Sequence, residues 1–504
     1  MAKFIELITN DLKKLRTVDK RLMSYNIEMT EITGGTFWKE YSEAQISGKE
    51  LFPIPTDFSN FTATAELMQY YPPINLYDEK LRRLAKAFGS CIIRVSGSWA
   101  TKTYYDFDGL TGGVPPKGYQ SVLTREQWIG VLDFVKAVDG QLLISVSNCE
   151  GDHKDGGPLD LSQTKKIFDL SHSYGVDVYA AEFMNEPNML EFSGAPTGYT
   201  AKDFSRDQEI FNTWVRQNYP DCLIVGPCTT GDLTVGTLGK NMTAGIGSLM
   251  KTATTDELMQ DAKIPLDVFS YHYYNGISER LAGMLPMAHW SAEDAHTDAY
   301  LDVARQNAVG HAALRDKYVP NGQMWVTESG DAGGGGNTWA STYLDVLRTL
   351  VELGSFATVS DGIIFHNTLA SSDYGFLKHG SFEPRPNYFA ALLWTKLMGT
   401  TVYDCSNLCA PNLHVYCHSR KDGEHGAVYL IVNNSTTDIV SAKIPTESYV
   451  YSLSGNGSLR SKTIYLNNSP LSLDKNGNLP PIVGKNEKAG SVELLPGSCT
   501  FIVI

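Results

Sequence analysis

Eight short apolar runs alternate with longer helix-like segments between residues 21 and 395, and this alternation constrains the fold more than any other feature. Each run has the length of a buried strand, and helical spacing is found in intervening segments such as TREQWIGVLDFVKAVDG. Strands that alternate with helices form parallel sheets, and eight such units match a closed barrel. The sequence therefore predicts an α/β fold with a (β/α)8 TIM barrel. The runs cover residues 22–29, 91–99, 142–149, 177–186, 222–228, 266–275, 323–330 and 361–368.

The sequence changes character after about residue 396. Short strand-like runs such as LHVYCHSR, GAVYLIVNN and CTFIVI are separated there by Gly, Asn, Ser and Pro, which is typical of an all-β sandwich. An apolar run at Phe4 to Thr9 precedes the barrel pattern, and we expect this strand to join the sandwich. The predicted units are residues 1–20, an N-terminal strand of the sandwich, 21–395, the barrel, and 396–504, the sandwich. No long flexible linker separates them, so we expect rigid packing.

Two glutamates stand at the carboxyl ends of predicted strands. Glu186 follows the fourth run in DVYAAEFMNEPN, and Glu328 ends the seventh in QMWVTESG. A carboxylate at such a position is a poor choice for packing, because burying it unpaired costs several kcal/mol, on the order of 2–7 for a polar group and more for a charge. Catalytic groups of (β/α)8 barrels lie at this end of the strands. The pattern indicates that both acids belong to one site.

A pair of carboxyl groups across a glycosidic bond is the machinery of glycoside hydrolysis. We predict Glu186 as the general acid/base, Glu328 as the nucleophile, and Tyr273 as the residue that orients Glu328. Asn185 suits the 2-hydroxyl of the sugar. Simpler interpretations exist: each glutamate could cap a helix or pair with an arginine, and Tyr273 could be an ordinary rim aromatic. His272 is interpreted as a hydrogen-bonded core histidine rather than a base.

Composition excludes several partners. The net charge is −14, which argues against nucleic acid, since phosphate binding requires a clustered basic surface. The densest basic cluster, between Lys13 and Arg21, is interpreted as the solvated edge of a sheet. No apolar run is long enough to span a membrane, and MAKFIELITN is not a signal peptide, although Met1-Ala2 could replace a removed leader. We favour a secreted, periplasmic or lysosome-like compartment, and the oligomeric state is left open.

The eight cysteines contain no CxxC pair, and no zinc cluster is expected. Those within apolar runs, such as Cys91, are predicted to be buried free thiols. Cys405 and Cys409 could form a disulfide in an oxidising compartment. We expect no metal or other cofactor, although a metal-dependent hydrolase using His272 and His366 is an alternative.

Several motifs together resemble one known family. NEPN, YHYYNG and TESGDAGGGG resemble retaining glycoside hydrolases with a (β/α)8 barrel. DGIIFHNTLASSDYGFL and PRPNYFAALLWTKLMGTTV narrow the resemblance to the heparanase and β-glucuronidase family, glycoside hydrolase family 79. The resemblance extends over nearly the whole chain, from the N-terminal strand to LLPGSCTFIVI.

The resemblance implies the same two acids, Glu186 and Glu328. It also implies that Tyr374-Gly375, after the eighth strand, binds the glucuronate carboxylate, with Gly334 and Gly335 of the glycine-rich loop close by. Glycines let backbone N–H groups approach an anion closely. The alternative is a plain flexible loop. Many relatives have a tyrosine where this chain has Gly333, which leaves the sugar preference open.

Three further positions, Glu28, Asn148 and Ser98, match positions where relatives line the terminal sugar subsite. They could equally be structural hydrogen-bonding residues of the barrel mouth.

The predicted function is a retaining β-glucuronidase that cleaves β-linked glucuronic acid, with or without a 4-O-methyl group, from a glycan or glycoside. The alternatives are a heparanase-like endo-enzyme acting on heparan sulfate, a glucosidase or xylosidase, and a carbohydrate-binding protein without catalysis.

Overall fold

Eight parallel strands close into a barrel in the computed structural model, which describes residues 3–55, 67–231, 235 and 251–504. Met1 and Ala2, where a removed leader was considered, lie outside the described residues. Each barrel strand falls on one of the eight predicted runs, so the prediction of a TIM barrel is confirmed. The strands are β3 (Met23–Glu28), β6 (Ile92–Ser96), β9 (Gln141–Ser145), β10 (Val178–Glu182), β11 (Leu223–Thr230), β12 (Val268–Tyr274), β13 (Gln323–Gly330) and β14 (Ile364–His366).

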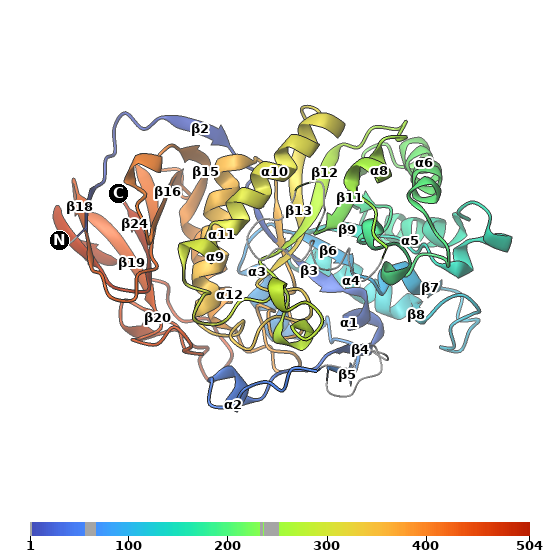
Figure 1. The fold of residues 1–504 in the computed structure, drawn as a ribbon, viewed down its shortest axis with the longest axis horizontal. Helices are drawn as coiled ribbons and strands as arrows, with labels where there is room; N and C mark the ends of the chain where they lie inside the picture. Colours follow the sequence, from blue (N-terminus) through green and yellow to red (C-terminus); the bar gives the residue numbers. More distant parts are fainter. Residues whose placement is uncertain (1–2, 56–66, 232–234, 236–250) are drawn as a thin grey trace.

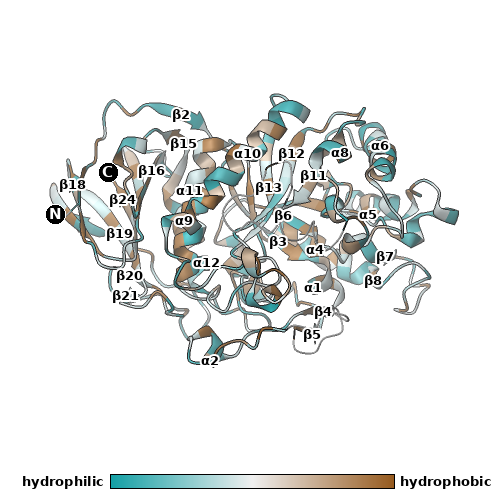
Figure 2. Cartoon of the chain, viewed as in Figure 1, coloured by the Kyte–Doolittle hydropathy of each residue, from teal (hydrophilic) through white to brown (hydrophobic). Residues whose placement is uncertain are grey.

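Helices surround this barrel (Figure 1). They include α1 (Met29–Thr33), α2 (Glu43–Ile46), α3 (Glu79–Lys86), α4 (Arg125–Ala137), α5 (Ser162–Ser173), α6 (Ala201–Asn218), α8 (Thr255–Met259), α9 (Asp298–Leu301), α10 (Val303–Tyr318), α11 (Leu344–Val359) and α12 (Pro386–Leu397). The longer outer helices in Figure 2 carry both brown (hydrophobic) and teal (hydrophilic) residues, as expected for amphipathic helices with one buried and one exposed face.

Helix α4 illustrates why these segments are helical. Thr124 and Gln127 form a capping box, in which the Thr124 hydroxyl accepts from the Gln127 N–H at 3.2 Å and the Gln127 side chain accepts from the Thr124 N–H at 2.9 Å. The apolar residues that follow recur at i, i+3, i+4 and i+7, which places them on the face toward the barrel. They are the buried Trp128, Val131, Leu132 and Val135.

A β-domain packs beside the barrel, at the left of Figure 1. Its larger sheet is antiparallel in the order β2, β15, β16, β17, β24, β19, β20, β21, with β22 also pairing with β19. The bounds are β2 (Lys14–Thr17), β15 (Met398–Tyr403), β16 (Leu413–Arg420), β17 (Ala427–Asn433), β19 (Ser448–Ser454), β20 (Tyr465–Leu466), β21 (Ser469–Pro470), β22 (Lys485–Glu487) and β24 (Ser498–Val503). The basic strand β2 lies at the edge of this sheet, as expected.

A smaller sheet covers the first one. It consists of β1 (Lys3–Glu6), β18 (Val440–Ile444) and β23 (Gly490–Leu494), and β1 pairs with β18 in parallel. Apolar side chains from both sheets, among them Ile5, Val415 and Ile502, form one buried cluster. The run at the N-terminus therefore pairs with the C-terminal part of the chain.

The barrel and the β-domain share a continuous core. Buried side chains of α11, such as Leu350, belong to the same cluster as Val428 and Phe501 of the larger sheet. The hydroxyl of Tyr343, just before α11, donates to the carbonyl of Leu453 in β19 at 2.7 Å. The two units therefore pack against each other through buried apolar side chains.

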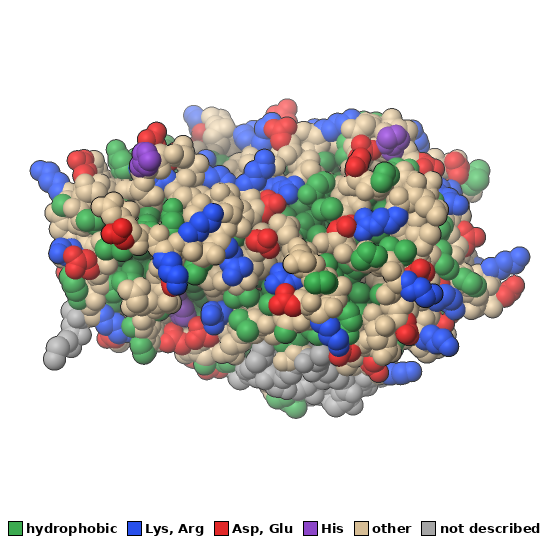
Figure 3. Space-filling view, turned by 90° about the horizontal axis from the view of Figure 1, so that it is seen from above, with side chains coloured by type: hydrophobic (Ala, Val, Ile, Leu, Met, Phe, Trp, Pro, Cys, Tyr) green, Lys and Arg blue, Asp and Glu red, His purple; other side chains and the backbone are tan. Residues whose placement is uncertain are grey.

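The outer surface carries charges of both signs. Lys, Arg, Asp and Glu side chains are interspersed over the face seen in Figure 3. Among the described residues, no helix has both the length and the apolarity needed to cross a membrane.

All eight cysteines are free thiols. Cys405 and Cys409 both contact the carbonyl of Val415, at 3.1 and 3.6 Å, and no disulfide joins them.

Candidate active site

The two predicted acids meet at the carboxyl ends of the barrel strands. Glu328 lies within β13, and its side chain is 9% exposed. Glu186 lies four residues beyond β10, in a loop, with a left-handed backbone (φ 45°). One carboxylate oxygen of each residue and a ring nitrogen of His272 all lie within 4.8 Å of one another. Two residues that are 142 positions apart in the chain therefore face the same small space.

Glu328 receives a hydrogen bond on each of its oxygens. The hydroxyl of Tyr274 donates to Oε1 at 2.5 Å, and Nη1 of Arg94 donates to Oε2 at 3.2 Å. A cation and a phenol together fix both oxygens of the carboxylate and its orientation.

Glu186 has a more open environment, with a side chain that is 17% exposed. His272 Nδ1 lies 3.0 Å from its Oε1 and 3.6 Å from Oε2 of Glu328, so this buried imidazole lies between the two acids. The other ring nitrogen, Nε2, lies 3.2 Å from Nη2 of Arg94. His272 is thus hydrogen-bonded, as expected, but its partners are the two predicted acids themselves.

Arg94 was missed in the sequence analysis. It is fully buried in β6, where Nε donates to Glu182 Oε2 at 2.9 Å and Nη2 donates to Asn185 Oδ1 at 2.8 Å, besides its bond to Glu328. Burying a guanidinium is costly unless it is paired, and here two carboxylates face it. The sequence feature that could have identified Arg94 as a site residue is its position in the middle of the apolar run CIIRVSGSW.

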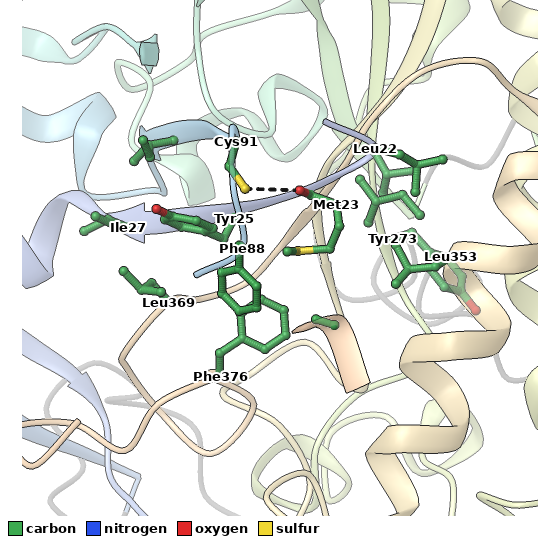
Figure 4. Packing of buried hydrophobic residues seen from close by; sticks show 14 of the residues in the cluster. Leu22, Met23, Tyr25, Ile27, Phe88, Cys91, Tyr273, Leu353, Leu369 and Phe376 are labelled. Carbon is green, nitrogen blue, oxygen red and sulfur yellow. Dashed lines mark hydrogen bonds between the residues drawn. The ribbon is translucent and has the colours of Figure 1, made fainter. Parts of the chain in front are cut away.

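The prediction that Tyr273 orients Glu328 is wrong, because Tyr274 makes that contact. Side chains alternate between the two faces of a strand, and in β12 His272 and Tyr274 both contact the acid pair while Tyr273, between them, points away from it. Tyr273 is buried in the core beside Leu353 of α11 (Figure 4). Burial raises the pKa of Tyr273 well above its usual range. The choice between two adjacent tyrosines depended on strand phase, which the run YHYY leaves ambiguous.

The three residues predicted to line the sugar subsite have different environments. Glu28 is buried, and burial together with the charges of Glu328 and Glu31 raises its pKa well above the usual range. Its Oε2 lies against Gly97, where an added Cβ would be only 1.6 Å away. Ser98 is half-buried.

The amide of Asn148 is occupied within the protein. Its Oδ1 lies 2.8 Å from His153 Nε2, and its Nδ2 lies 3.3 Å from the hydroxyl of Tyr199. Asn185, in contrast, lies beside the acids, and its Oδ1 accepts from Arg94 and, at 3.2 Å, from Ser96. Asn148 is therefore tied to a structural network, whereas Asn185 belongs to the acid centre.

Tyr374 and Gly375 lie next to the acid centre. Asn367 Nδ2 donates to the hydroxyl of Tyr274 at 2.9 Å and to that of Tyr374 at 3.1 Å, and the two tyrosine rings stack with centroids 6.4 Å apart. Because Tyr274 also contacts Glu328, one chain of hydrogen bonds connects the loop after β14 with this acid.

The glycine-rich loop packs against buried side chains. The carbonyl of Gly334 accepts from Ser278 at 2.9 Å and from Arg280 at 3.2 Å, and that of Gly335 accepts from Ser372 at 2.8 Å. Both glycines have positive φ angles, 90° and 85°. The prediction of a loop near Tyr374-Gly375 agrees with the Gly335–Ser372 contact, and the loop is held by hydrogen bonds rather than free.

Two groups of side chains in the described part of the chain have the spacing of metal ligands. They are Glu186, His272, Glu328 and Glu182, Cys228, His272. His366 belongs to neither, since its Nε2 bonds the carbonyl of Tyr374 at 2.8 Å and its ring stacks on Phe376. The guanidinium of Arg94 contacts members of both groups and would repel a cation. The pairing of His272 with His366 on a metal is therefore not supported.

The chain is similar to several known proteins. No family model matches the chain. Heparanase-like protein 1 of Arabidopsis thaliana is 25% identical over 479 residues, which cover 84% of this chain and 83% of the relative. Baicalin-beta-D-glucuronidase of Scutellaria baicalensis is 30% identical over 188 residues, 35% of each chain. The crystal structure of a 4-O-alpha-L-rhamnosyl-beta-D-glucuronidase from Fusarium oxysporum 12S has the same fold, with a TM-score of 0.63 and 12% identity over 100% of both chains.

The barrel, the acid pair at its carboxyl rim and these relatives define a glycoside hydrolase. Within that class, the similarity to heparanase-like proteins and to a β-glucuronidase confirms the resemblance to glycoside hydrolase family 79.

Proposed function

We propose that this protein is a retaining β-glucuronidase. The observation that carries the proposal is the separation of the acids, whose nearest carboxylate oxygens lie within 4.8 Å. Retaining enzymes have carboxyl groups about 5–5.5 Å apart, whereas inverting enzymes need roughly 6.5–9.5 Å to admit a water. The short separation therefore favours direct attack by one carboxylate.

The environments of the two acids support their proposed roles. Glu328 has a cation on one oxygen and a phenol on the other, which suits a nucleophile that must be charged and fixed in direction. Glu186 is more exposed and lies on a loop, where it can reach both the leaving group and water. In the first step a Glu328 oxygen bonds to the anomeric carbon, the bond to the leaving oxygen breaks, and Glu186 donates its proton to that oxygen.

The second step reverses these roles. Glu186, now a carboxylate, takes a proton from water, the water oxygen bonds to the anomeric carbon, and the ester bond to Glu328 breaks. Two inversions give a product with the configuration of the substrate.

The proposed substrate is a β-glucuronide, whose carboxylate binds at Tyr374-Gly375. The phenol of Tyr374 is part of the hydrogen-bond chain to Glu328, and this connection supports a role of the loop in binding the reacting sugar. The names of the relatives, which include a β-glucuronidase and heparanase-like proteins, support a uronic acid substrate.

A screen of aryl glycosides tests the proposed function. The purified protein should release the chromophore from the aryl β-glucuronide, and the freshly released sugar should be the β anomer by NMR. Matched glucoside, xyloside and galactoside report on specificity, and heparan sulfate reports on endo-cleavage. Inactivity on every β-glucuronide, or initial release of the α anomer, would overturn the proposal.

The adjacent tyrosines of β12 provide a matched pair of variants. Tyr274→Phe removes the donor to Glu328, and we expect kcat/KM on an aryl β-glucuronide to fall about 10- to 100-fold, the effect of losing a hydrogen bond to a charged group. Tyr273→Phe, one residue away in the core, should leave kcat/KM within about threefold, because its hydroxyl lies away from the acids. Equal effects of the two substitutions would contradict the role of Tyr274.

A further inference from the structure

Four consecutive peptide carbonyls in the loop after β14 all accept hydrogen bonds from buried side chains. Those of Ser372, Asp373 and Gly375 accept from Nη1 of Arg385, the last two at 3.0 and 3.1 Å. The carbonyl of Tyr374 accepts from two other side chains, His366 at 2.8 Å and Asn387 at 3.2 Å. Each carbonyl of this segment is thus fixed by a buried donor.

The direction of these carbonyls fixes the direction of the N–H groups. In a trans peptide the N–H of the next residue points opposite to the carbonyl. The N–H of Asp373 and that of Phe376 bond to the carbonyls of Gly335, at 3.2 Å, and Thr368, at 3.0 Å. Within the described part of the chain, the N–H groups of Tyr374 and Gly375 have no hydrogen-bond partner. These two adjacent N–H groups therefore point away from the buried side chains that hold the carbonyls of Asp373 and Tyr374.

The glycine-rich loop runs beside the first of these donors, the N–H of Tyr374. An added Cβ at Gly336 would lie 3.0 Å from the backbone nitrogen of Tyr374. Gly336 has a φ of 85°, a conformation that residues with a side chain rarely adopt. A residue with a side chain at this position would crowd the Tyr374 N–H.

Arg385 differs from Arg280, another buried arginine of this region. Arg280 forms a 2.7 Å ion pair with Asp373, whereas the carboxylate nearest to Arg385 is that of Glu40, at 3.8 Å. Burial lowers the pKa of Arg385 from its usual value. Peptide carbonyls, rather than a short ion pair, surround the positive charge of this guanidinium, and the carboxylates of Asp373, Glu40 and Asp345 act on it from further away. The adjacent peptides are aligned by that charge, with their N–H ends directed outward.

We propose that Arg385 is a positioning residue for uronate recognition: it orients the Ser372 to Gly375 peptides so that the N–H groups of Tyr374 and Gly375 bind the substrate carboxylate, and its charge favours that anion. The inference rests on the proposed function, because it concerns how that site selects a uronic acid over a neutral sugar. Arg385 does not touch the reacting atoms, so its effect is on binding of the carboxylate rather than on bond cleavage.

Steady-state kinetics of Arg385→Gln and Arg385→Lys test this role. For Arg385→Gln we expect the KM for an aryl β-glucuronide to rise about 10- to 100-fold, as for the loss of charge-assisted hydrogen bonds, with kcat within about threefold. The inhibition constant of glucuronate should rise by the same factor, and that of its neutral methyl ester should not change. Arg385→Lys keeps the charge but not the planar fork, and its KM should lie between those of Arg385→Gln and the wild type.

Arg460 provides a control. Its guanidinium also donates to backbone carbonyls, those of Gln45 and Ile46 at 3.0–3.2 Å, and to the hydroxyl of Thr338 at 3.2 Å, but to none of the carbonyls from Ser372 to Gly375. Arg460→Gln should leave the KM and the selectivity for the charged inhibitor unchanged.

The outcomes separate the two proposals. If the wild type cleaves β-glucuronides but Arg385→Gln lowers kcat and weakens glucuronate and its methyl ester equally, the positioning role fails and the proposed function stands. If Arg385→Gln does not fold, the Arg385→Lys variant decides by the same ratio of inhibition constants. If the wild type cleaves no β-glucuronide, both proposals fail.

Discussion

Replacing Glu328 by alanine should abolish turnover of an aryl β-glucuronide, with kcat lowered by about 10⁴-fold or more, as expected for the loss of a nucleophile. The physical reason is that no other carboxylate takes its place. Glu186 faces Glu328 across the same small space, and the side chains that hydrogen-bond Glu328 are the donors Arg94 and Tyr274. The measurement is kcat on the aryl glucuronide, with circular dichroism showing that the variant is folded.

Azide makes this experiment specific for the nucleophile. In the Glu328→Ala variant, azide can occupy the vacated space and attack the anomeric carbon once, which yields an α-glucuronyl azide from a β-glucuronide. The wild type with azide is the control and should give only β-glucuronate. Residual activity of Glu328→Ala near the wild-type level, or a β-azide product, would contradict the assignment.

Replacing Glu186 by glutamine should have an effect that depends on the leaving group. The amide cannot donate the proton that a poor leaving group needs, so kcat/KM should fall about 10²- to 10⁴-fold on alkyl or sugar glucuronides. A leaving group that departs as a stable anion, such as a nitrophenolate, needs no proton, and its first step should be slowed far less. The measurement is a plot of log kcat/KM against the pKa of the leaving group, which should be much steeper than for the wild type.

Glu191 supplies a matched control on the same loop. Its carboxylate accepts from the backbone N–H of Gly198 at 2.6 Å and does not contact the acid pair. Glu191→Gln should therefore keep the wild-type slope. Equal losses of Glu186→Gln on good and poor leaving groups would mean that Glu186 is not the acid.

Much of the fold was predictable because the barrel is encoded locally. Each of its eight strands is a short apolar run between helical segments, and all eight were located from the sequence, from Met23–Glu28 to Ile364–His366. The β-domain was visible for the same reason, in runs such as the one that became β16 (Leu413–Arg420). Burial on both faces of a parallel strand leaves an apolar run that needs no tertiary information to be read.

The candidate site was predictable only in part. The glutamates stood out because a carboxylate after an apolar strand has no packing role. The strand end itself was misplaced: β10 stops at Glu182, whose carboxylate pairs with Arg94, and Glu186 lies four residues further along. In YHYY every residue is compatible with either face, so Tyr273 was chosen where Tyr274 makes the contact.

The amino-acid sequence by itself determined the class of fold, the presence of the β-domain and the two glutamates that meet at the barrel rim, since each follows from the local character of short segments. Only the tertiary structure decided which side chains surround those acids. Arg94, His272, Tyr274 and Asn367 come from three different strands or strand ends, and their distances depend on the closure and register of the whole barrel. Such long-range geometry leaves no mark in any one segment, because each of these residues is also compatible with an ordinary buried position.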